Sequence, residues 1–119
     1  MSGHKIIHVE LSATDRKALS RFYANVFGWE LQHIDEMNYT TFKAGDGVGG
    51  GFNPVTEENP VGTVIVYIET DDVTASLNDV QKAGGTIISP EMEIPNTGKF
   101  GIFRDPQGNL IGLYKANPM

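Results

Sequence analysis

The feature that most constrains this chain is a strand–helix–strand pattern that occurs twice. Residues 6–31 begin with alternating β-forming residues, continue with an apolar helical stripe and resume an apolar run after Gly28. Residues 63–88 repeat this order. Asp15 (or Thr14) and Asp72 (or Asp71) precede the two helices and can accept their unpaired backbone N–H groups. Because Asp15 and Asp72 lie 57 positions apart (72 − 15), close to half of 119 residues, the sequence predicts one supersecondary unit used twice.

Apolar patterning predicts the remaining elements. Further strands are expected at residues 30–33, 37–43, 99–104 and 110–115. The glycine-rich residues 45–51 are expected to form a flexible junction, and Phe52-Asn53-Pro54 to break any element that follows. Residues 90–98, which contain two prolines, are expected to be a loop. Each half then has one strand, one helix and about three strands, which predicts an α+β fold with mixed sheets rich in hairpins.

The helix of the first half carries an apolar stripe at helical spacing, namely Leu19, Phe22, Tyr23, Val26 and Phe27. A stripe of this kind is typical of a helix that packs one face against a sheet. Trp29 follows directly after the helix stop at Gly28, so we expect it to pack in the core.

Composition limits the classes of partner. The net charge of −6, with lysine and arginine scattered singly, argues against a nucleic-acid partner, which would need a basic stripe. No apolar run approaches the roughly 18 residues of a membrane span, and the first residues lack a signal-peptide core. The chain has no cysteine, so nothing in it needs an oxidising compartment. We therefore expect no membrane partner and a cytoplasmic location.

Four stretches resemble one known family in the right order along nearly the whole chain. They are HVEL at 8–11, Asp15 with FYANVFGWEL at 22–31, YIETDDVTASL at 67–77, and FRDPQGNLIGLYK at 103–115. Together they look like the vicinal oxygen chelate superfamily, which includes glyoxalases, bleomycin resistance proteins and dioxygenases. The resemblance implies a single domain over residues 1–119, built of two βαβββ modules at about 5–55 and 62–116. In such proteins, curved mixed sheets form a cleft, and the chain commonly forms a homodimer.

The resemblance also assigns four positions to metal ligands, one on each of four strands. The first falls on His8, which matches, whereas the second falls within Gly49–Gly51, the third on Ile65 and the fourth on Gly112, where no donor side chain exists. A two-residue shift would allow Tyr67 or Glu69 as the third ligand and Tyr114 as the fourth. One imidazole does not hold an ion tightly. We therefore assign no metal ligand and expect no cofactor, with a divalent metal recruited through His8 as the alternative.

The family's strand facing suggests which residues line the cleft: His8, Glu10, Ile65, Tyr67, Glu69, Gly112 and Tyr114. Among them, His8, Glu10 and Glu69 are the candidates for catalysis, because two carboxylates in a partly dry site repel and the pKa of one rises toward acid–base duty. The alternatives are a structural, hydrogen-bonded His8 and solvated carboxylates at strand ends. Gly112 is expected to leave room beside Tyr114 for the ring of a substrate.

These observations favour a protein that binds a small organic ligand in its cleft with an incomplete metal site, similar to the antibiotic-sequestering members of the family. The contrasting hypothesis is an enzyme, either a metal-dependent glyoxalase-like lyase or isomerase or a dioxygenase-related one. In a third reading, side chains fill the cleft and the protein serves only as a scaffold. Residues 45–50 formally match G-x-G-x-x-G, but Phe52-Asn53-Pro54 cannot open the helix that a dinucleotide site requires.

Overall fold

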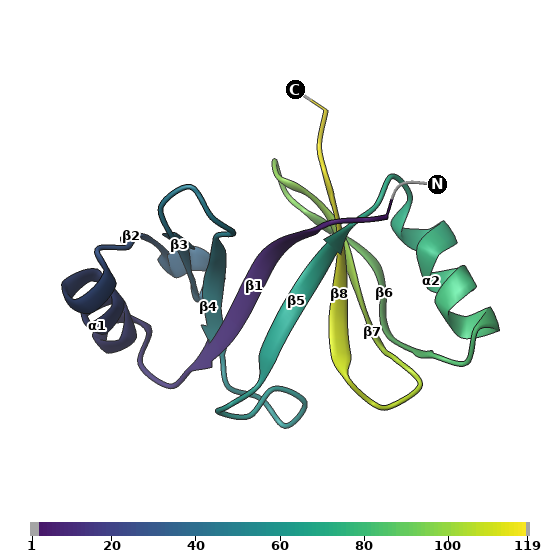
Figure 1. Cartoon of the computed structure of the whole chain (residues 1–119), viewed down its shortest axis with the longest axis horizontal. Helices are drawn as coiled ribbons and strands as arrows, with labels where there is room; N and C mark the ends of the chain where they lie inside the picture. The colour runs from purple at the N-terminus through teal and green to yellow at the C-terminus, as the bar shows by residue number, and fades with distance from the viewer. Residues whose placement is uncertain (1–2, 119) are drawn as a thin grey trace. The chain divides into compact units, whose positions relative to one another are not determined.

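The structure is a computed structural model that describes residues 3–118 (Figure 1). Two compact units divide the chain: the N-terminal unit comprises residues 7–65, and the C-terminal unit comprises residues 66–118 together with residues 3–6. The first half of the chain supplies β1 (Ile6–Ala13), α1 (Arg16–Phe27), β2 (Glu30–Ile34), a 3₁₀ turn η1 (Asp35–Met37), β3 (Tyr39–Lys43) and β4 (Gly50–Pro54). The second half supplies β5 (Val64–Glu69), α2 (Val73–Lys82), β6 (Thr86–Ile94), β7 (Gly98–Arg104) and β8 (Leu110–Ala116).

Both halves have the βαβββ order, so the predicted α+β class is confirmed. In the N-terminal unit the strand order is β2-β3-β4-β1, and β1, which precedes α1, pairs with β4 in parallel. In the C-terminal unit the order is β5-β8-β7-β6, and β5 pairs with β8 in parallel. The other pairs in each unit are antiparallel, as the mixed-sheet prediction requires.

The predicted helix caps are both present. The Asp15 carboxylate accepts a hydrogen bond from the Ala18 N–H at 3.0 Å, and the Asp72 carboxylate accepts one from the Ala75 N–H at 3.0 Å. Helix α1 ends at Gly28, which adopts the left-handed conformation with φ = 72°. The local sequence therefore sets both helix starts and the end of α1.

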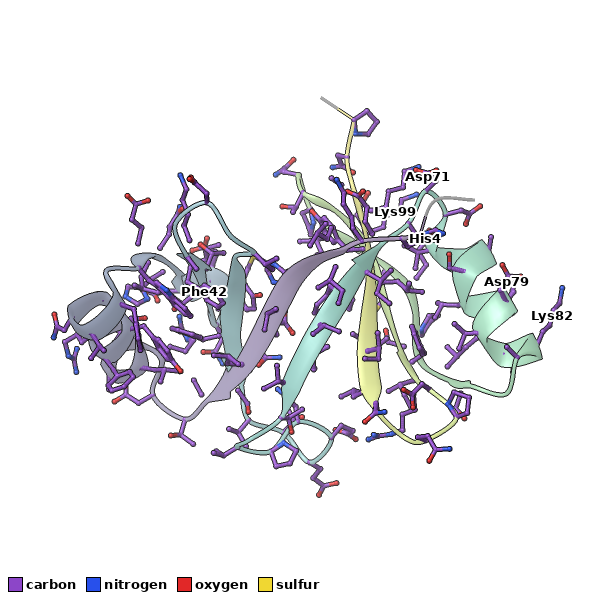
Figure 2. All side chains as sticks on the ribbon, viewed as in Figure 1. His4, Phe42, Asp71, Asp79, Lys82 and Lys99 are labelled. Atoms are coloured by element: carbon purple, nitrogen blue, oxygen red, sulfur yellow. The ribbon has the colours of Figure 1, made fainter. Side chains whose placement is uncertain are left out.

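Each unit has its own apolar core between its helix and its sheet. In the N-terminal unit the buried residues are Ala13, Phe42 and Phe52, against which Leu11, Leu19, Tyr23, Trp29, Leu31 and Ala44 pack. The Trp29 ring stacks between the rings of Tyr23 and Phe42, with centroids 4.5 and 4.4 Å away. Figure 2 shows Phe42 among the side chains gathered beside α1. The C-terminal core is built on Val73, Leu77, Phe103 and Leu113.

Two loop predictions were wrong. Gly50–Pro54 forms β4 because Gly50 lets the β1 backbone come close: a Cβ on Gly50 would collide with the Val9 carbonyl oxygen. Gly50 is therefore required for the close pairing of β4 with β1 and is not part of a flexible junction. Residues 90–94 continue β6, because Pro90 lies on an edge strand whose pairing with β7 shifts register on both sides of Ser89.

The apolar stripe of α1 is only partly buried. Leu19 and Tyr23 pack in the core, whereas Phe22, Val26 and Phe27 are 52%, 57% and 62% exposed. Within residues 3–118, no helix has the length and apolar character needed to cross a membrane.

Candidate functional site

One face of β1 carries the polar side chains that the sequence singled out. Leu11 and Ala13 point into the core beneath α1, so the alternation of a strand sends His8 and Glu10 to the opposite face. The His8 side chain is 30% exposed and that of Glu10 is 12% exposed. The sequence therefore predicted correctly that His8 and Glu10 share one face.

Hydrogen bonds join these two residues to Tyr39 on β3 and Asn53 on β4. The Tyr39 hydroxyl donates to Glu10 Oε2 at 2.9 Å, and Asn53 Nδ2 donates to Glu10 Oε1 at 2.9 Å. His8 Nε2 lies 2.8 Å from the Tyr39 hydroxyl oxygen and 3.9 Å from Glu10 Oε2. The His8 and Tyr39 rings are nearly parallel, at 14°. We call His8, Glu10, Tyr39 and Asn53 the His8 cluster.

The single proton of the Tyr39 hydroxyl fixes the direction of this chain of hydrogen bonds. Because that proton goes to Glu10, the hydroxyl oxygen accepts from His8, and the neutral His8 ring carries its proton on Nε2. Burial lowers the pKa of His8 below its ordinary value, which favours this neutral form. The cluster is therefore a directed chain from His8 through Tyr39 to the Glu10 carboxylate.

A glycine makes room for Tyr39. Gly51 lies opposite Glu10 in the β1–β4 register, and a Cβ on it would collide with the Tyr39 hydroxyl and ring. Asn53, two residues further along β4, lies on the same face. Its Oδ1 atom is buried without a hydrogen-bond partner among the described residues, because the amide turns its N–H toward Glu10. A buried acceptor without a donor is rare and costly, and such groups occur at functional sites.

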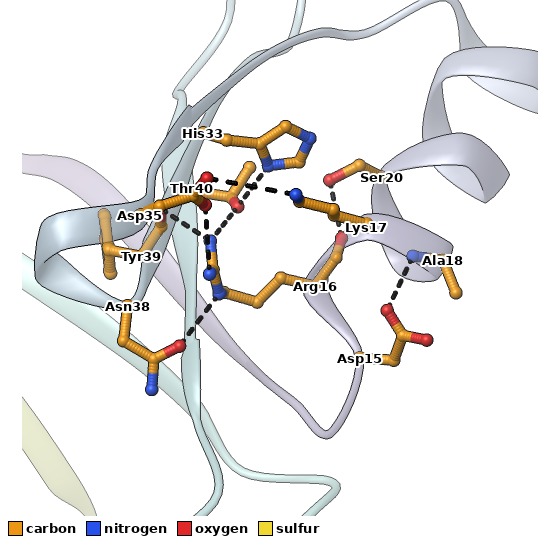
Figure 3. Close-up of polar contacts among 10 residues, drawn as sticks. All are labelled: Asp15, Arg16, Lys17, Ala18, Ser20, His33, Asp35, Asn38, Tyr39 and Thr40. Atoms are coloured by element: carbon orange, nitrogen blue, oxygen red, sulfur yellow. Dashed lines mark hydrogen bonds and ion pairs between the residues drawn. The ribbon is translucent and has the colours of Figure 1, made fainter.

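Arg16 holds the start of β3 in place (Figure 3). Its guanidinium donates to the Tyr39 carbonyl oxygen at 2.9 Å, to Thr40 Oγ1 at 2.8 Å and to Asn38 Oδ1 at 3.2 Å. Thr40 Oγ1 also lies 2.8 Å from His33 Nδ1. Because Arg16 is the first residue of α1, it ties the helix start to the backbone of Tyr39. Arg16 thus positions the strand that supplies Tyr39 to the His8 cluster.

An open hollow of about 530 Å³ lies beside this arginine, lined by Ala13, Thr14, Asp15, Arg16, Lys17, Asn38, Pro54 and Val55. Its two cationic groups are already engaged. Arg16 makes the bonds described above, and both Arg16 and Lys17 form ion pairs with Asp35, at 3.4 and 3.9 Å. We assign no ligand to this hollow.

The residues predicted on the C-terminal unit lie in a different setting. Tyr67 is buried and pairs with Gly112 across the β5–β8 register, and its ring lies where a Cβ of Gly112 would be. The predicted open space beside Gly112 was therefore wrong, because the Tyr67 ring fills it. The Tyr114 hydroxyl donates to the Thr97 carbonyl oxygen at 3.4 Å, and burial raises the pKa of Tyr114. Glu69 is exposed at the end of β5.

The side chains at the four metal positions of the family do not fit a four-donor ion. His8 is a donor, but side chains at Gly50 and Gly51 would collide with the Val9 backbone and with Tyr39. Ile65 is buried and apolar, and Gly112 lies beneath Tyr67. Among residues 3–118, no three His, Cys, Asp or Glu side chains gather as they would around an ion. The His8 cluster contains two side chains of these four types, His8 and Glu10.

Sequence reasoning missed Tyr39 and Asn53. Tyr39 begins a strand whose alternate residues Thr40 and Phe42 are buried, which is a signal that its own side chain takes the other face. Asn53 was assigned to a chain break, so its place on a strand was lost. That His8, Glu10, Ile65, Tyr67, Glu69, Gly112 and Tyr114 contact a ligand stays a prediction.

The comparisons with known proteins agree with the fold and the motifs. Residues 5–113 match the profile of the Glyoxalase/Bleomycin resistance protein/Dioxygenase superfamily. A glyoxylase-like domain-containing protein of Didymella fabae is 31% identical over 117 residues, which cover 92% of this chain and 91% of that protein. The anthracycline biosynthesis protein DnrV of Streptomyces peucetius is 24% identical over 127 residues, covering 92% of this chain but 46% of DnrV.

Other relatives from Mycobacterium are longer too, and the chain spans only 44% of their length. Among solved structures, methylmalonyl-CoA epimerase from Mycobacterium tuberculosis has the same fold, with a TM-score of 0.70 at 14% identity over 95% of this chain and 88% of the epimerase. The family profile covers most of the sequence, and its relatives and structural neighbours agree. The chain therefore belongs to the Glyoxalase/Bleomycin resistance protein/Dioxygenase superfamily.

Proposed function

We propose that this protein binds a small organic molecule at the His8 cluster without a four-ligand metal centre. The observation that carries the proposal is the hydrogen-bonded chain from His8 through Tyr39 to Glu10, at the strand face where the family places its first metal ligand. The Glu10 carboxylate in that chain already accepts hydrogen bonds from Tyr39 and Asn53. These bonds hold the polar side chains of the cluster in fixed positions, in which they can form hydrogen bonds with a polar group of a ligand.

The chemistry of the cluster suits a neutral ligand with polar atoms beside a flat apolar part. His8 is neutral near pH 7 because burial lowers its pKa, so it offers hydrogen bonding without a net positive charge. The parallel rings of His8 and Tyr39 present flat surfaces next to those polar atoms. The family name and relatives such as the anthracycline biosynthesis protein DnrV support small organic molecules as the ligand class.

A matched pair of histidine variants tests the binding site. We expect wild-type protein, purified without a chelator, to bind the neutral, flat fluorescent probe Nile red and to contain no stoichiometric metal by elemental analysis. His8→Gln should weaken probe binding, whereas His4→Gln, which changes an exposed histidine on the C-terminal unit, should not. Equal probe binding by both variants contradicts the site. Stoichiometric Zn, Ni, Mn or Fe that only His8→Gln removes contradicts the metal-free proposal.

The second candidate is a proton-transfer enzyme, a glyoxalase-like lyase or isomerase. The directed hydrogen bonds from His8 to Glu10 favour it, because such a chain can pass a proton between a substrate and a buried carboxylate. Hydroxyacetone in D₂O is a simple probe: abstraction of a proton next to its carbonyl group and return of a deuteron from solvent labels that carbon. Deuterium uptake that Glu10→Gln abolishes supports the enzyme over the binding protein.

A further inference from the structure

The connection between β4 and β5 is an exposed loop with one buried, polar side chain. Residues 55–63, which we call the strap, belong to the N-terminal unit and run from the end of β4 to the start of β5 (Figure 1). Every residue from 55 to 62 is exposed except Asn59, which is only 6% exposed. A buried amide is stable only where its N–H and C=O groups find hydrogen-bond partners. The partners of Asn59 therefore decide how firmly the strap is held.

Side-chain hydrogen bonds fasten the strap to β4 and β1. Asn59 Nδ2 donates to the Pro54 carbonyl oxygen at 3.3 Å, and Ser12 Oγ donates to the Pro60 carbonyl oxygen at 2.8 Å. The strap also has backbone bonds of its own, because the N–H groups of Asn59 and Thr56 each donate to the carbonyl oxygen of the other residue at 3.2 Å. The strap can therefore leave β1 and β4 without unfolding its own turn.

The point where the strap is fastened to β1 adjoins the His8 cluster. Ser12 lies two residues beyond Glu10 and on the same face of β1. In the β1–β4 register Ser12 is opposite Asn53, whose Nδ2 atom donates to Glu10. Because Ser12 bonds to Pro60, the fastened strap borders the His8 cluster at its Asn53 end.

Unsatisfied hydrogen-bond acceptors gather at this contact. In the part of the chain that the structure describes, the buried side-chain atoms without a hydrogen-bond partner are Asn53 Oδ1 and Asn59 Oδ1. One belongs to the residue that fastens the strap, and the other to the residue opposite Ser12. A buried acceptor without a donor destabilises the conformation that buries it, and solvent or a ligand supplies a donor once the strap lifts. The fastened strap is therefore destabilised where it meets the His8 cluster, which favours opening.

We propose that the strap is a lid that opens to admit a ligand to the His8 cluster, and that Asn59 holds its closed form. This inference deepens the proposed small-molecule function and depends on it. Opening breaks the Asn59–Pro54 and Ser12–Pro60 hydrogen bonds and gives a ligand access to the Asn53 end of the cluster. A lid of this kind sets the rates at which a ligand enters and leaves its site.

Thiol labelling without any ligand tests whether Asn59 holds the strap closed. The chain contains no cysteine, so Ser12→Cys places a single thiol under Pro60. In this background, Asn59→Asp should raise the rate of alkylation by iodoacetamide more than about fivefold, because it removes the donor to Pro54 and puts a charge at a buried position. Thr56→Asp is the matched control, since it adds the same charge at an exposed residue of the strap. Equal rates in the two variants, with both folded by circular dichroism, overturn the role of Asn59.

A disulfide that locks the strap tests whether it controls access to the site. The Ser12–Pro60 contact is short enough for Ser12→Cys/Pro60→Cys to form a disulfide under mild oxidation. We expect the oxidised double variant to bind Nile red at least about tenfold more slowly than its reduced form in stopped-flow fluorescence. Dithiothreitol should restore the rate, whereas the same oxidant should leave the wild type and Ser12→Cys unchanged.

The outcomes of the two tests separate the lid from the binding site. A double variant that forms no disulfide contradicts the contact between Ser12 and Pro60, and equal Nile red rates in the oxidised and reduced forms overturn the lid. A wild type that binds no Nile red overturns the proposed function and the control of access with it. Thiol labelling needs no ligand, so it decides in each case whether Asn59 holds the strap closed.

Discussion

The two units place a tyrosine ring over a glycine at equivalent register positions, but they take the tyrosine from different strands. In the N-terminal unit, Gly51 pairs with Glu10, and the covering ring is Tyr39 from β3. In the C-terminal unit, Gly112 pairs with Tyr67, which itself covers the glycine. The position that holds a carboxylate in one unit therefore holds the covering ring in the other.

Because of this difference, the N-terminal unit has a cluster of hydrogen-bonded polar side chains over its glycine, whereas the C-terminal unit has the ring of Tyr67 there. Because Tyr39 comes from a neighbouring strand, its hydroxyl can reach across to Glu10 and His8. Tyr67 occupies the strand position equivalent to Glu10, so that position carries an aromatic ring instead of a carboxylate. The two units thus share a backbone arrangement but differ in the polar groups they present, because the tyrosine that covers the glycine comes from a different strand in each unit.

The largest effect expected is on the two glycines. Gly51→Ala and Gly112→Ala should each lower the free energy of unfolding by about 1–3 kcal/mol, because each new methyl group displaces a tyrosine ring. Urea denaturation measures this loss. Gly3→Ala is the control, since a Cβ there meets no atom within 4 Å.

The NMR signals of the His8 ring sharpen the comparison between the units. Gly51→Ala should shift them strongly, since it moves Tyr39. Gly112→Ala should shift them less, since it moves Tyr67 instead. An unchanged stability in Gly51→Ala would show that Tyr39 does not need the space above this glycine.

A smaller loss is expected from removing one hydroxyl group. Tyr39→Phe should lower the free energy of unfolding by about 1–2 kcal/mol, because Glu10 loses a donor and the His8 N–H loses its acceptor. Tyr114→Phe removes a hydroxyl that makes a long bond of 3.4 Å, and it should cost less than about 0.5 kcal/mol. A cost of Tyr39→Phe no larger than about 0.5 kcal/mol would mean that the Tyr39 hydroxyl adds little to stability.

The smallest effect expected is the contribution of His8 to the pH dependence of stability. Burial lowers the pKa of His8 in the folded state, so the unfolded state binds a proton first as pH falls. The stabilisation is complete above the ordinary histidine pKa of about 6.5 and is lost as pH falls through the lower folded-state pKa. Urea denaturation at several pH values should show a slope that His8→Gln reduces. If His4→Gln reduces the slope equally, the pH dependence does not come from the burial of His8.

Much of the fold followed from local sequence. The caps at Asp15 and Asp72 and the helix stop at Gly28 were predictable, because each depends on residues a few positions apart. The strand at Gly50–Pro54 was not, because its glycines satisfy a close approach to Val9, which lies about forty residues away in sequence. The site was half predictable for the same reason: strand alternation identified His8 and Glu10, whereas Tyr39 and Asn53 reach them only across paired strands.

By itself, the sequence determined a duplicated βαβββ chain, both helix starts, the end of α1 and the polar face of β1. These depend on hydrogen bonding and side-chain direction within one element. Only the tertiary structure decided that Tyr39 completes the His8 cluster, that Tyr67 fills the space over Gly112, and that three of the five residues of the α1 stripe are left exposed. Each of those outcomes depends on which strand or helix lies next to a residue, and that neighbour is set by pairing between segments far apart in the chain.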